Sequence, residues 1–164
     1  MDEKLEERAG SALTVKGWTL ALAESCTGGL IAHRITDVPG SSDYFLGGIV
    51  AYSNAVKESL LSVSNGTLQA VGAVSEETAQ EMAQGARQTI GSDVGLSVTG
   101  IAGPGGGTGE KPVGLTFIGI STPEGEWVER HVFQGDRQSI KKSAAEAALN
   151  LLLTALEGNA SRPA

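Results

Sequence analysis

The sequence has one cysteine, few aromatic residues and no long apolar run. Cys26 has no second thiol with which to form an intrachain disulfide or a metal-binding pair, and we interpret it as a small buried residue. Aromatic residues make up 4% of the chain, so Ala, Val, Leu and Ile must fill its core. No run of about 18 apolar residues is available to span a bilayer. We therefore expect a soluble, cytoplasmic protein with no membrane partner.

Positive charge is also scarce. The chain has 12 Lys and Arg against 19 Asp and Glu, a net charge of −7, and its only adjacent basic pair is Lys141-Lys142 among scattered single cations. Proteins that bind nucleic acid need a basic surface that neutralises phosphates, so we expect no nucleic-acid partner. An anionic substrate would need a local cluster of cations that acts against the overall field.

Motifs for metals and common cofactors are missing. His33 and His131 lie far apart, and neither belongs to an HxxxH, CxxC or paired-carboxylate pattern. No Walker loop occurs, and no GxGxxG stands between a predicted strand and a helix. We therefore expect no metal and no cofactor, which leaves hydroxyl, lysine and backbone-amide chemistry.

Periodicity predicts a single domain over residues 1–164, with a core of about 5–157 and a frayed tail at 158–164. We expect helices over 2–16, 30–35, 54–61, 75–90 and 137–156, and strands over 18–23, 45–52, 93–99, 113–121 and 126–133. Residues 62–74 look like a loop, and the last two strands like an antiparallel hairpin. This order predicts an α/β fold, a three-layer α/β/α sandwich around a mixed, mostly parallel sheet.

Two unusual loops follow predicted strands, where open α/β sheets bind ligands. Residues 24–29 place Ser25, Thr27 and two glycines at a helix start, where free amides favour an anion, although ordinary capping explains the same residues. Residues 100–109 contain six glycines, which suits either close approach of the backbone to a ligand or a flexible surface loop.

Two further clusters surround the second predicted strand. Residues 40–44, which include Ser42, precede it, and Tyr52 and Lys57 straddle its end. Across a strand-to-helix corner Tyr52 and Lys57 would converge on one hydroxyl, and a desolvated lysine with a lowered pKa can act as general base toward a serine. A surface lysine beside a half-buried tyrosine is the alternative. Arg137, just inside the last helix, is either a solvated residue or a phosphate ligand.

Five segments together resemble the CinA C-terminal domain family, the nicotinamide mononucleotide deamidases. They are AESCTGG at 23–29, GIVAYSN at 48–54 followed by Lys57, GAVS at 72–75, TGIAGPGG at 99–106 and KPVG at 111–114. The resemblance runs in order from about residue 18 to 156. It implies a three-layer α/β/α domain, usually dimeric, that releases ammonia from nicotinamide mononucleotide without a metal. Many members carry a further N-terminal domain similar to molybdopterin-binding proteins, whose activity we do not expect of this chain.

The resemblance also implies which residues act. The family's active-site positions match Ser25, Ser42, Tyr52, Lys57, Thr99 and Arg137. Our hypothesis makes Lys57 the base for a serine and the acid for the leaving nitrogen, with Tyr52 hydrogen-bonded in that relay. Either serine is a candidate nucleophile, with Ser42 preferred and Ser25 left as an oxyanion or substrate contact. Backbone amides near Ser25 or near Thr99 to Gly103 would hold the oxyanion.

The expected substrate-binding residues come mainly from the two glycine-containing loops. They are Thr27, Gly28, Thr99, Gly100, Gly103, Gly105 and Arg137. Arg137 is the candidate phosphate ligand, reaching across the interface of a homodimer. Two other functions stay open at this point: a phosphate-binding regulatory module without turnover, and an interaction protein linked to competence or DNA damage.

Overall fold

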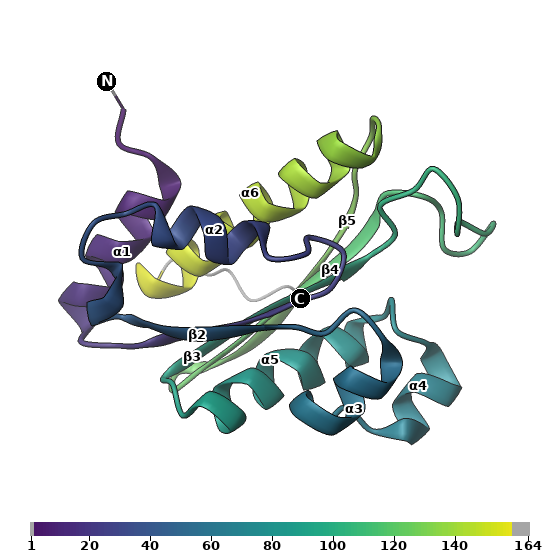
Figure 1. Ribbon diagram of the computed structural model, residues 1–164, viewed down its shortest axis with the longest axis horizontal. Coiled ribbons are helices and arrows are strands. Elements are labelled where there is room, and N and C mark those ends of the chain that lie inside the picture. The colour runs from purple at the N-terminus through teal and green to yellow at the C-terminus, as the bar shows by residue number, and fades with distance from the viewer. Residues whose placement is uncertain (1, 159–164) are drawn as a thin grey trace.

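The computed structural model describes residues 2–158 and is built on a mixed five-stranded sheet (Figure 1). The strands lie in the order β2-β1-β3-β4-β5. β1 pairs in parallel with β2 and β3, β4 runs antiparallel to β3, and β5 runs antiparallel to β4. Their bounds are β1 Leu20–Glu24, β2 Phe45–Val50, β3 Val94–Gly100, β4 Leu115–Thr122 and β5 Gly125–Val132. The mixed sheet and the late β4–β5 hairpin are as the sequence predicts.

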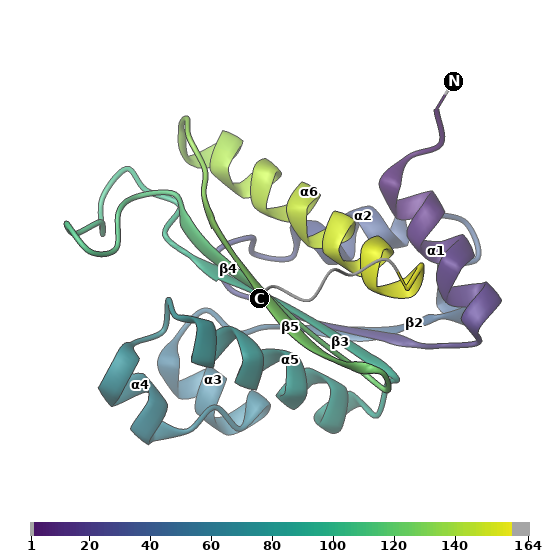
Figure 2. The same ribbon diagram turned by 180° about the vertical axis from the view of Figure 1, so that it is seen from behind.

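Helices cover both faces of the sheet (Figures 1 and 2). One layer holds α1 Leu5–Lys16, α2 Leu30–Thr36 and α6 Arg137–Leu156. The other holds α3 Asn54–Leu61, α4 Asn65–Val71 and α5 Glu76–Ile90, and the short 3-10 turn η1 Ser41–Asp43 precedes β2. This arrangement confirms the predicted three-layer α/β/α sandwich.

Apolar side chains of alternate strand residues fill two cores. Leu22, Leu96 and Ile118 face α6 on one side of the sheet, and Ala21 and Ala23 face α5 on the other. On the α5 side the backbones of helix and strand are in direct contact, since a Cβ at Gly95 would overlap the Ala83 carbonyl oxygen. A side chain there would push α5 off the sheet, so glycine sets the spacing of this layer.

Capping residues fix where the helices begin, and most of them can be predicted from the sequence. Ser75 Oγ accepts a hydrogen bond from the Thr78 amide at 3.2 Å, and Asp136 Oδ1 accepts one from the Ser139 amide at 2.8 Å. The interpretation of 62–74 as loop is wrong, because α4 lies inside it behind the capping residue Ser64. Of the predicted frayed tail, residues 159–164 lie outside the described residues.

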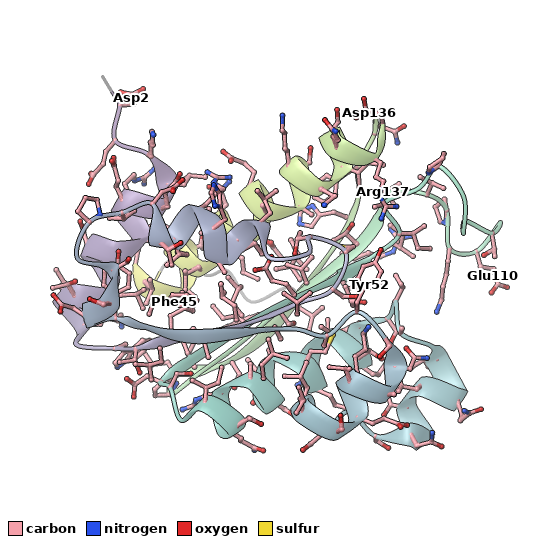
Figure 3. The ribbon with its side chains drawn as sticks, in the orientation of Figure 1. Asp2, Phe45, Tyr52, Glu110, Asp136 and Arg137 are labelled. Atoms are coloured by element: carbon pink, nitrogen blue, oxygen red, sulfur yellow. The ribbon has the colours of Figure 1, made fainter. Side chains whose placement is uncertain are left out.

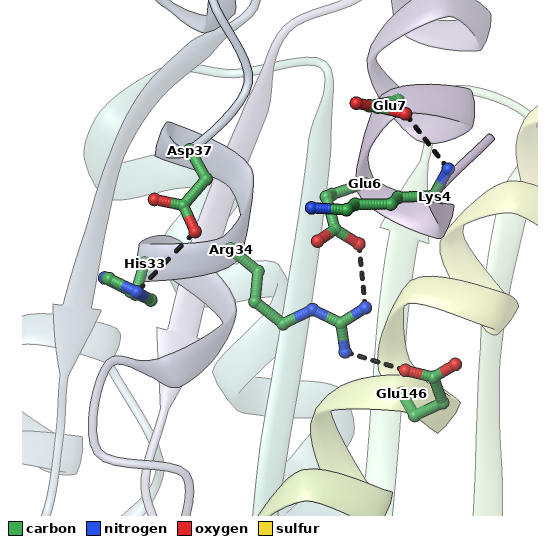
Figure 4. Close-up of polar contacts among 7 residues, drawn as sticks. All are labelled: Lys4, Glu6, Glu7, His33, Arg34, Asp37 and Glu146. Atoms are coloured by element: carbon green, nitrogen blue, oxygen red, sulfur yellow. Dashed lines mark hydrogen bonds and ion pairs between the residues drawn. The ribbon is translucent and has the colours of Figure 1, made fainter. Parts of the chain in front are cut away.

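An ion-pair cluster joins the three helices of the first layer (Figure 4). Arg34 of α2 donates to Glu6 of α1 at 2.7 Å and to Glu146 of α6 at 2.8 Å. Burial by itself would raise the pKa of Glu6, but the hydrogen bond and charge of Arg34 outweigh it and the pKa is lowered. The cluster ties α2 to α1 and α6. Between residues 2 and 158 no helix is long and apolar enough to cross a bilayer.

Candidate active site

A cavity of about 190 Å³ opens at the carboxyl ends of β1, β2 and β3. The loop after β1, the corner after β2 and the start of the glycine-rich loop after β3 all reach it, as the two-loop argument from the sequence predicts. The volume corresponds to about six water molecules, enough for a small ring and its substituent. Its lining residues are Ser25, Cys26, Tyr52, Asn54, Lys57, Ala73, Val74, Thr99, Gly100, Ala102 and Arg137.

Lys57 is the most unusual residue of this cavity. It lies in the first turns of α3, whose N-cap Ser53 accepts a hydrogen bond from the Val56 amide, and the lysine is only 1% exposed. Its Nζ lies 2.9 Å from the Ala51 carbonyl oxygen, 3.4 Å from that of Tyr52 and 3.2 Å from Ser25 Oγ. Within residues 2–158 no carboxylate forms an ion pair with it. Burial lowers the pKa of the Lys57 amine, because desolvation disfavours its charged form.

The three neighbours of this amine determine what it can do. Carbonyl oxygens only accept hydrogen bonds, so the contacts with Ala51 and Tyr52 each require an N–H from Lys57. A neutral amine has two N–H groups and one lone pair. With both N–H groups on carbonyls, the lone pair is left for the hydroxyl of Ser25. The neutral form is therefore oriented as a proton acceptor for that serine.

Ser25 is positioned by the strand-to-helix turn between β1 and α2. Its amide donates to the Val98 carbonyl oxygen of β3 at 3.0 Å, and the residue is 7% exposed. Gly28 and Gly29 follow with φ of 62° and 103°, left-handed conformations that let the chain turn back into α2. A serine on such a tight turn presents its hydroxyl at the end of the sheet, with the amide of the next residue beside it.

The start of α2 already holds an anion. Glu24, 1% exposed, accepts hydrogen bonds from Thr27 Oγ1 at 2.6 Å and from the amides of Ile31 and Ala32, both at 3.0 Å. The position expected for a substrate anion at this helix start is thus taken by the protein's own carboxylate. The hydroxyl of Thr27 donates its hydrogen bond to that carboxylate and does not face a substrate. The sequence interpretation missed Glu24, although an acidic residue that ends an apolar strand was the available signal.

Arg137 and Tyr52 meet at the mouth of the cavity (Figure 3). Arg137 donates to the Gly103 carbonyl oxygen at 2.6 Å and to the Tyr52 hydroxyl at 3.0 Å, and Tyr52 is 63% exposed. Tyr52 therefore contacts Lys57 through its backbone carbonyl only. The expected relay through the tyrosine hydroxyl is absent in this geometry, because Tyr52 follows the end of β2 with its side chain directed outward to Arg137.

Thr99 and Gly100 end β3 at the cavity wall. Thr99 Oγ1 donates to the Ala73 carbonyl oxygen at 2.8 Å and holds the segment before α5 in place. A Cβ at Gly100 would lie 2.7 Å from Thr116 Oγ1 and 3.2 Å from Cys26 Sγ, so packing requires this glycine. Gly105 lies farther out on the exposed loop and does not line the cavity, and neither does Gly28.

Ser42 lies at the other end of the molecule. It belongs to η1, which precedes β2, whereas Tyr52 and Lys57 follow that strand. Figure 3 shows Phe45, the first residue of β2, at the opposite side of the fold from Tyr52. Within one copy of the chain, the structure brings Ser25 and not Ser42 to Lys57.

Cys26 lines the cavity next to Ser25. Burial raises the pKa of its thiol to about 11, so the reactive thiolate is scarce at neutral pH. Among residues 2–158 no cluster of three or more His, Cys, Asp or Glu side chains is arranged to hold a metal. The chemically competent pair at this site is the lysine amine and the serine hydroxyl.

Comparisons with known proteins agree on one family. The model of the CinA C-terminal domain matches residues 2–156. A putative competence-damage inducible protein of Moorella thermoacetica is 53% identical over 155 residues, covering 94% of this chain and 37% of the relative. A CinA-like protein of Desulfotalea psychrophila is 51% identical over 150 residues, covering 92% and 36% respectively. The chain thus spans a little over a third of the length of these relatives.

Solved structures share the whole fold. The competence/damage inducible protein CihA from Agrobacterium tumefaciens aligns with a TM-score of 0.89 and 38% identity, over 96% of this chain and 98% of that one. The competence damage-inducible protein A from Klebsiella pneumoniae aligns with a TM-score of 0.90 and 33% identity, over 93% and 95%.

Proposed function

The chain belongs to the CinA C-terminal domain family, and from this premise we propose that it is an amidohydrolase that converts nicotinamide mononucleotide to nicotinate mononucleotide and ammonia. The observation that carries the proposal is the contact between the buried Lys57 amine and the Ser25 hydroxyl, 3.2 Å apart. A nucleophile within hydrogen-bond distance of a desolvated base is the core of covalent amide hydrolysis.

Attack begins when Ser25 Oγ adds to the carboxamide carbon and its proton passes to the lone pair of Lys57 Nζ. The carbonyl oxygen of the substrate becomes an oxyanion. The amide N–H of Cys26 lies next to the nucleophile and, within residues 2–158, donates no hydrogen bond to another residue, although it interacts with its own thiol. We assign that N–H to the oxyanion, which it would stabilise more strongly in this shielded cavity than in water.

Collapse of the tetrahedral intermediate breaks the carbon–nitrogen bond. The Lys57 ammonium returns its proton to the departing nitrogen, and ammonia leaves. An ester then joins the acyl group to Ser25. Lys57, neutral again, takes a proton from a water molecule that attacks this ester, and the serine recovers its hydrogen as nicotinate mononucleotide departs. The proton transfers to and from the serine oxygen, the leaving nitrogen and the attacking water all pass through one amine, and the proton of the product's carboxylic acid dissociates into solvent.

The dimensions of the site support a ring-plus-carboxamide substrate. The cavity of about 190 Å³ accommodates a pyridine ring and its carboxamide, and the ribose phosphate extends past the mouth. Arg137 stands there at the first position of α6, where the helix dipole disfavours a cation. Its two partners, Gly103 O and Tyr52 Oη, are neutral, so its charge is available to a phosphate.

We also propose that the protein forms a homodimer, in which Ser42 of one copy could contribute to the cavity of the other. β2 is an edge strand without a charged residue, and its Leu46 and Val50 are 47% and 49% exposed. An unprotected apolar edge of this kind is prone to pair with another chain. Only a second copy of this protein would bring a Ser42 near the cavity, as a contributor across the interface.

The experiment is to incubate the purified protein with nicotinamide mononucleotide in excess chelator and to measure ammonia and nicotinate mononucleotide. We expect equal molar amounts of both products. Binding of the mononucleotide without release of ammonia would contradict the proposal and would favour a ligand-binding module.

A further inference from the structure

Three cations of the described chain form ion pairs, and the others, including Arg87 and Arg130 outside the cavity, form none. Away from the cavity, Arg8, Lys16 and Arg34 each form an ion pair with a glutamate. Arg137 and Lys141 of α6 form none within residues 2–158. They are four residues apart, so they lie on the same face of the helix, one turn from each other.

Lys141 reaches the same loop that carries Ser25. Its Nζ would lie 3.8 Å from a Cβ built at Gly28, and the lysine is partly buried there. Gly28 has φ of 62° and no side chain, so nothing of its own covers its backbone on the side that faces the lysine. The next residue, Lys142, points into solvent. One lysine of the pair is therefore directed at the active-site loop and the other is not.

The expected phosphate position at the start of α2 is occupied by Glu24, which accepts hydrogen bonds from the amides of Ile31 and Ala32. A phosphomonoester carries a charge of about −1.5 to −2 at pH 7, which a single arginine does not balance. Lys57 and Lys111 are engaged with backbone carbonyls, of Ala51 and Val71 respectively. Within residues 2–158 the cations left near the cavity are those of α6. Arg137, which has further N–H groups besides those bonded to Gly103 and Tyr52, lines it, and Lys141 lies beside Gly28 of the loop that carries Ser25.

We infer that Lys141 is a second phosphate ligand, which acts with Arg137 and makes the site select a nucleotide over the corresponding nucleoside. The identity of the base in that nucleotide rests on the proposed function; the phosphate contact does not. Lys141 would approach the phosphate from the side of Gly28, and Arg137 from the side of Tyr52. The role is one of binding and specificity, because within residues 2–158 the cation that hydrogen-bonds to Ser25 Oγ is Lys57.

The test compares Lys141→Met with Lys142→Met, two neighbouring lysines changed to the same apolar side chain. The probes are nicotinate mononucleotide, the proposed product, and nicotinate riboside, which lacks the phosphate, both titrated calorimetrically. We expect Lys141→Met to raise the Kd for the mononucleotide by about 10-fold or more, the effect of losing one charge-assisted contact. The Kd for the riboside should stay at the wild-type value, and Lys142→Met should change neither.

An equal loss of affinity for the mononucleotide and the riboside in Lys141→Met would overturn the inference, and so would equal effects of the two lysine substitutions. Should Lys141→Met not fold, Lys141→Gln takes its place with the same expectations. If the wild-type protein releases no ammonia yet shows the Lys141-dependent preference for the mononucleotide, the proposed function fails and this inference holds. If ammonia is released but the preference is unchanged by the substitution, this inference fails alone.

Discussion

Arg34 and Lys57 are both cations withdrawn from water, and their surroundings are opposite. Arg34, at the junction of α1, α2 and α6, is held between the carboxylates of Glu6 and Glu146. Lys57, at the cavity, faces two carbonyl oxygens and a hydroxyl, with no ion pair in the described chain. A paired cation stabilises a helix junction and has no reason to lose its proton. A buried amine with neutral partners is destabilised in its charged form and becomes available as a base.

The same contrast extends to anions. Glu24, at the end of β1, and Lys57, in α3, are equally buried, each 1% exposed. Glu24 receives three hydrogen bonds from a hydroxyl and two amides, which satisfy its charge locally. Lys57 also has three neutral partners, but one of them is the Ser25 hydroxyl and burial lowers the pKa of the amine, which indicates a chemical role for Lys57 and a structural one for Glu24.

The largest effect should come from the nucleophile. We expect Ser25→Ala to lower kcat by about 10⁴-fold or more, the usual result of removing the attacking atom of a covalent mechanism. Ser42→Ala is the matched control, and steady-state ammonia release is the measurement. Because Ser42 lies at the far end of β2, we expect its loss to change kcat by less than about 10-fold, even if a second copy brings it near. Comparable modest losses in both variants would remove serine attack from the mechanism.

The next effect separates the two equally buried charges. Lys57→Met should lower kcat by about 10³-fold, since base and acid are lost together. Its free energy of unfolding should change by no more than about 1 kcal/mol, because replacing a buried amine by an apolar side chain of similar length offsets the lost hydrogen bonds. Glu24→Gln should lower that free energy by about 2 kcal/mol, because the donors at the start of α2 lose a charged acceptor. Urea denaturation measures both, and a reversed order of stabilities would contradict our assignment of roles.

The smallest effect tests the paired cation. Arg34→Met should lower the free energy of unfolding by about 1 kcal/mol and leave kcat/KM unchanged, because the exposed part of the cluster is screened by water. The lowered pKa of Glu6 gives stability that is present above its unfolded pKa and lost as the pH falls through its folded pKa. In urea denaturation between pH 7 and pH 3, the free energy of unfolding should fall less steeply in the variant than in the wild type. A fall in kcat/KM with unchanged stability would mean that the junction serves catalysis.

The fold was largely legible in the sequence because its helices carry clear caps and periodicity. Ser75 and Asp136 cap helices where the pattern predicts them. α4 was missed because Asn65, Gly66 and Thr67 are poor helix formers, and it is Ser64 and the packing against α5 that hold them in a helix.

The site was legible only in part. The sequence predicts that Lys57 acts on a serine hydroxyl, and the structure places Ser25 beside its amine. Within a single copy of the chain Ser42 lies away from Lys57, because residues before a parallel strand lie at the opposite end of the sheet from residues after it. The Tyr52 hydroxyl points outward and the Glu24 carboxylate caps α2. Both facts depend on the directions of side chains, which sequence spacing does not predict.

The central claim is that the Lys57 amine loses its proton more readily than an ordinary lysine, and the most direct measurement is its titration by NMR in protein labelled with ¹³C and ¹⁵N, assigned with Lys57→Met. We expect a midpoint below the ordinary lysine value of about 10.4, because burial disfavours the charged form. The pH profile of kcat/KM should rise along the same curve, since the neutral amine is the active base. A Lys57 that titrates at or above the ordinary value would contradict the account.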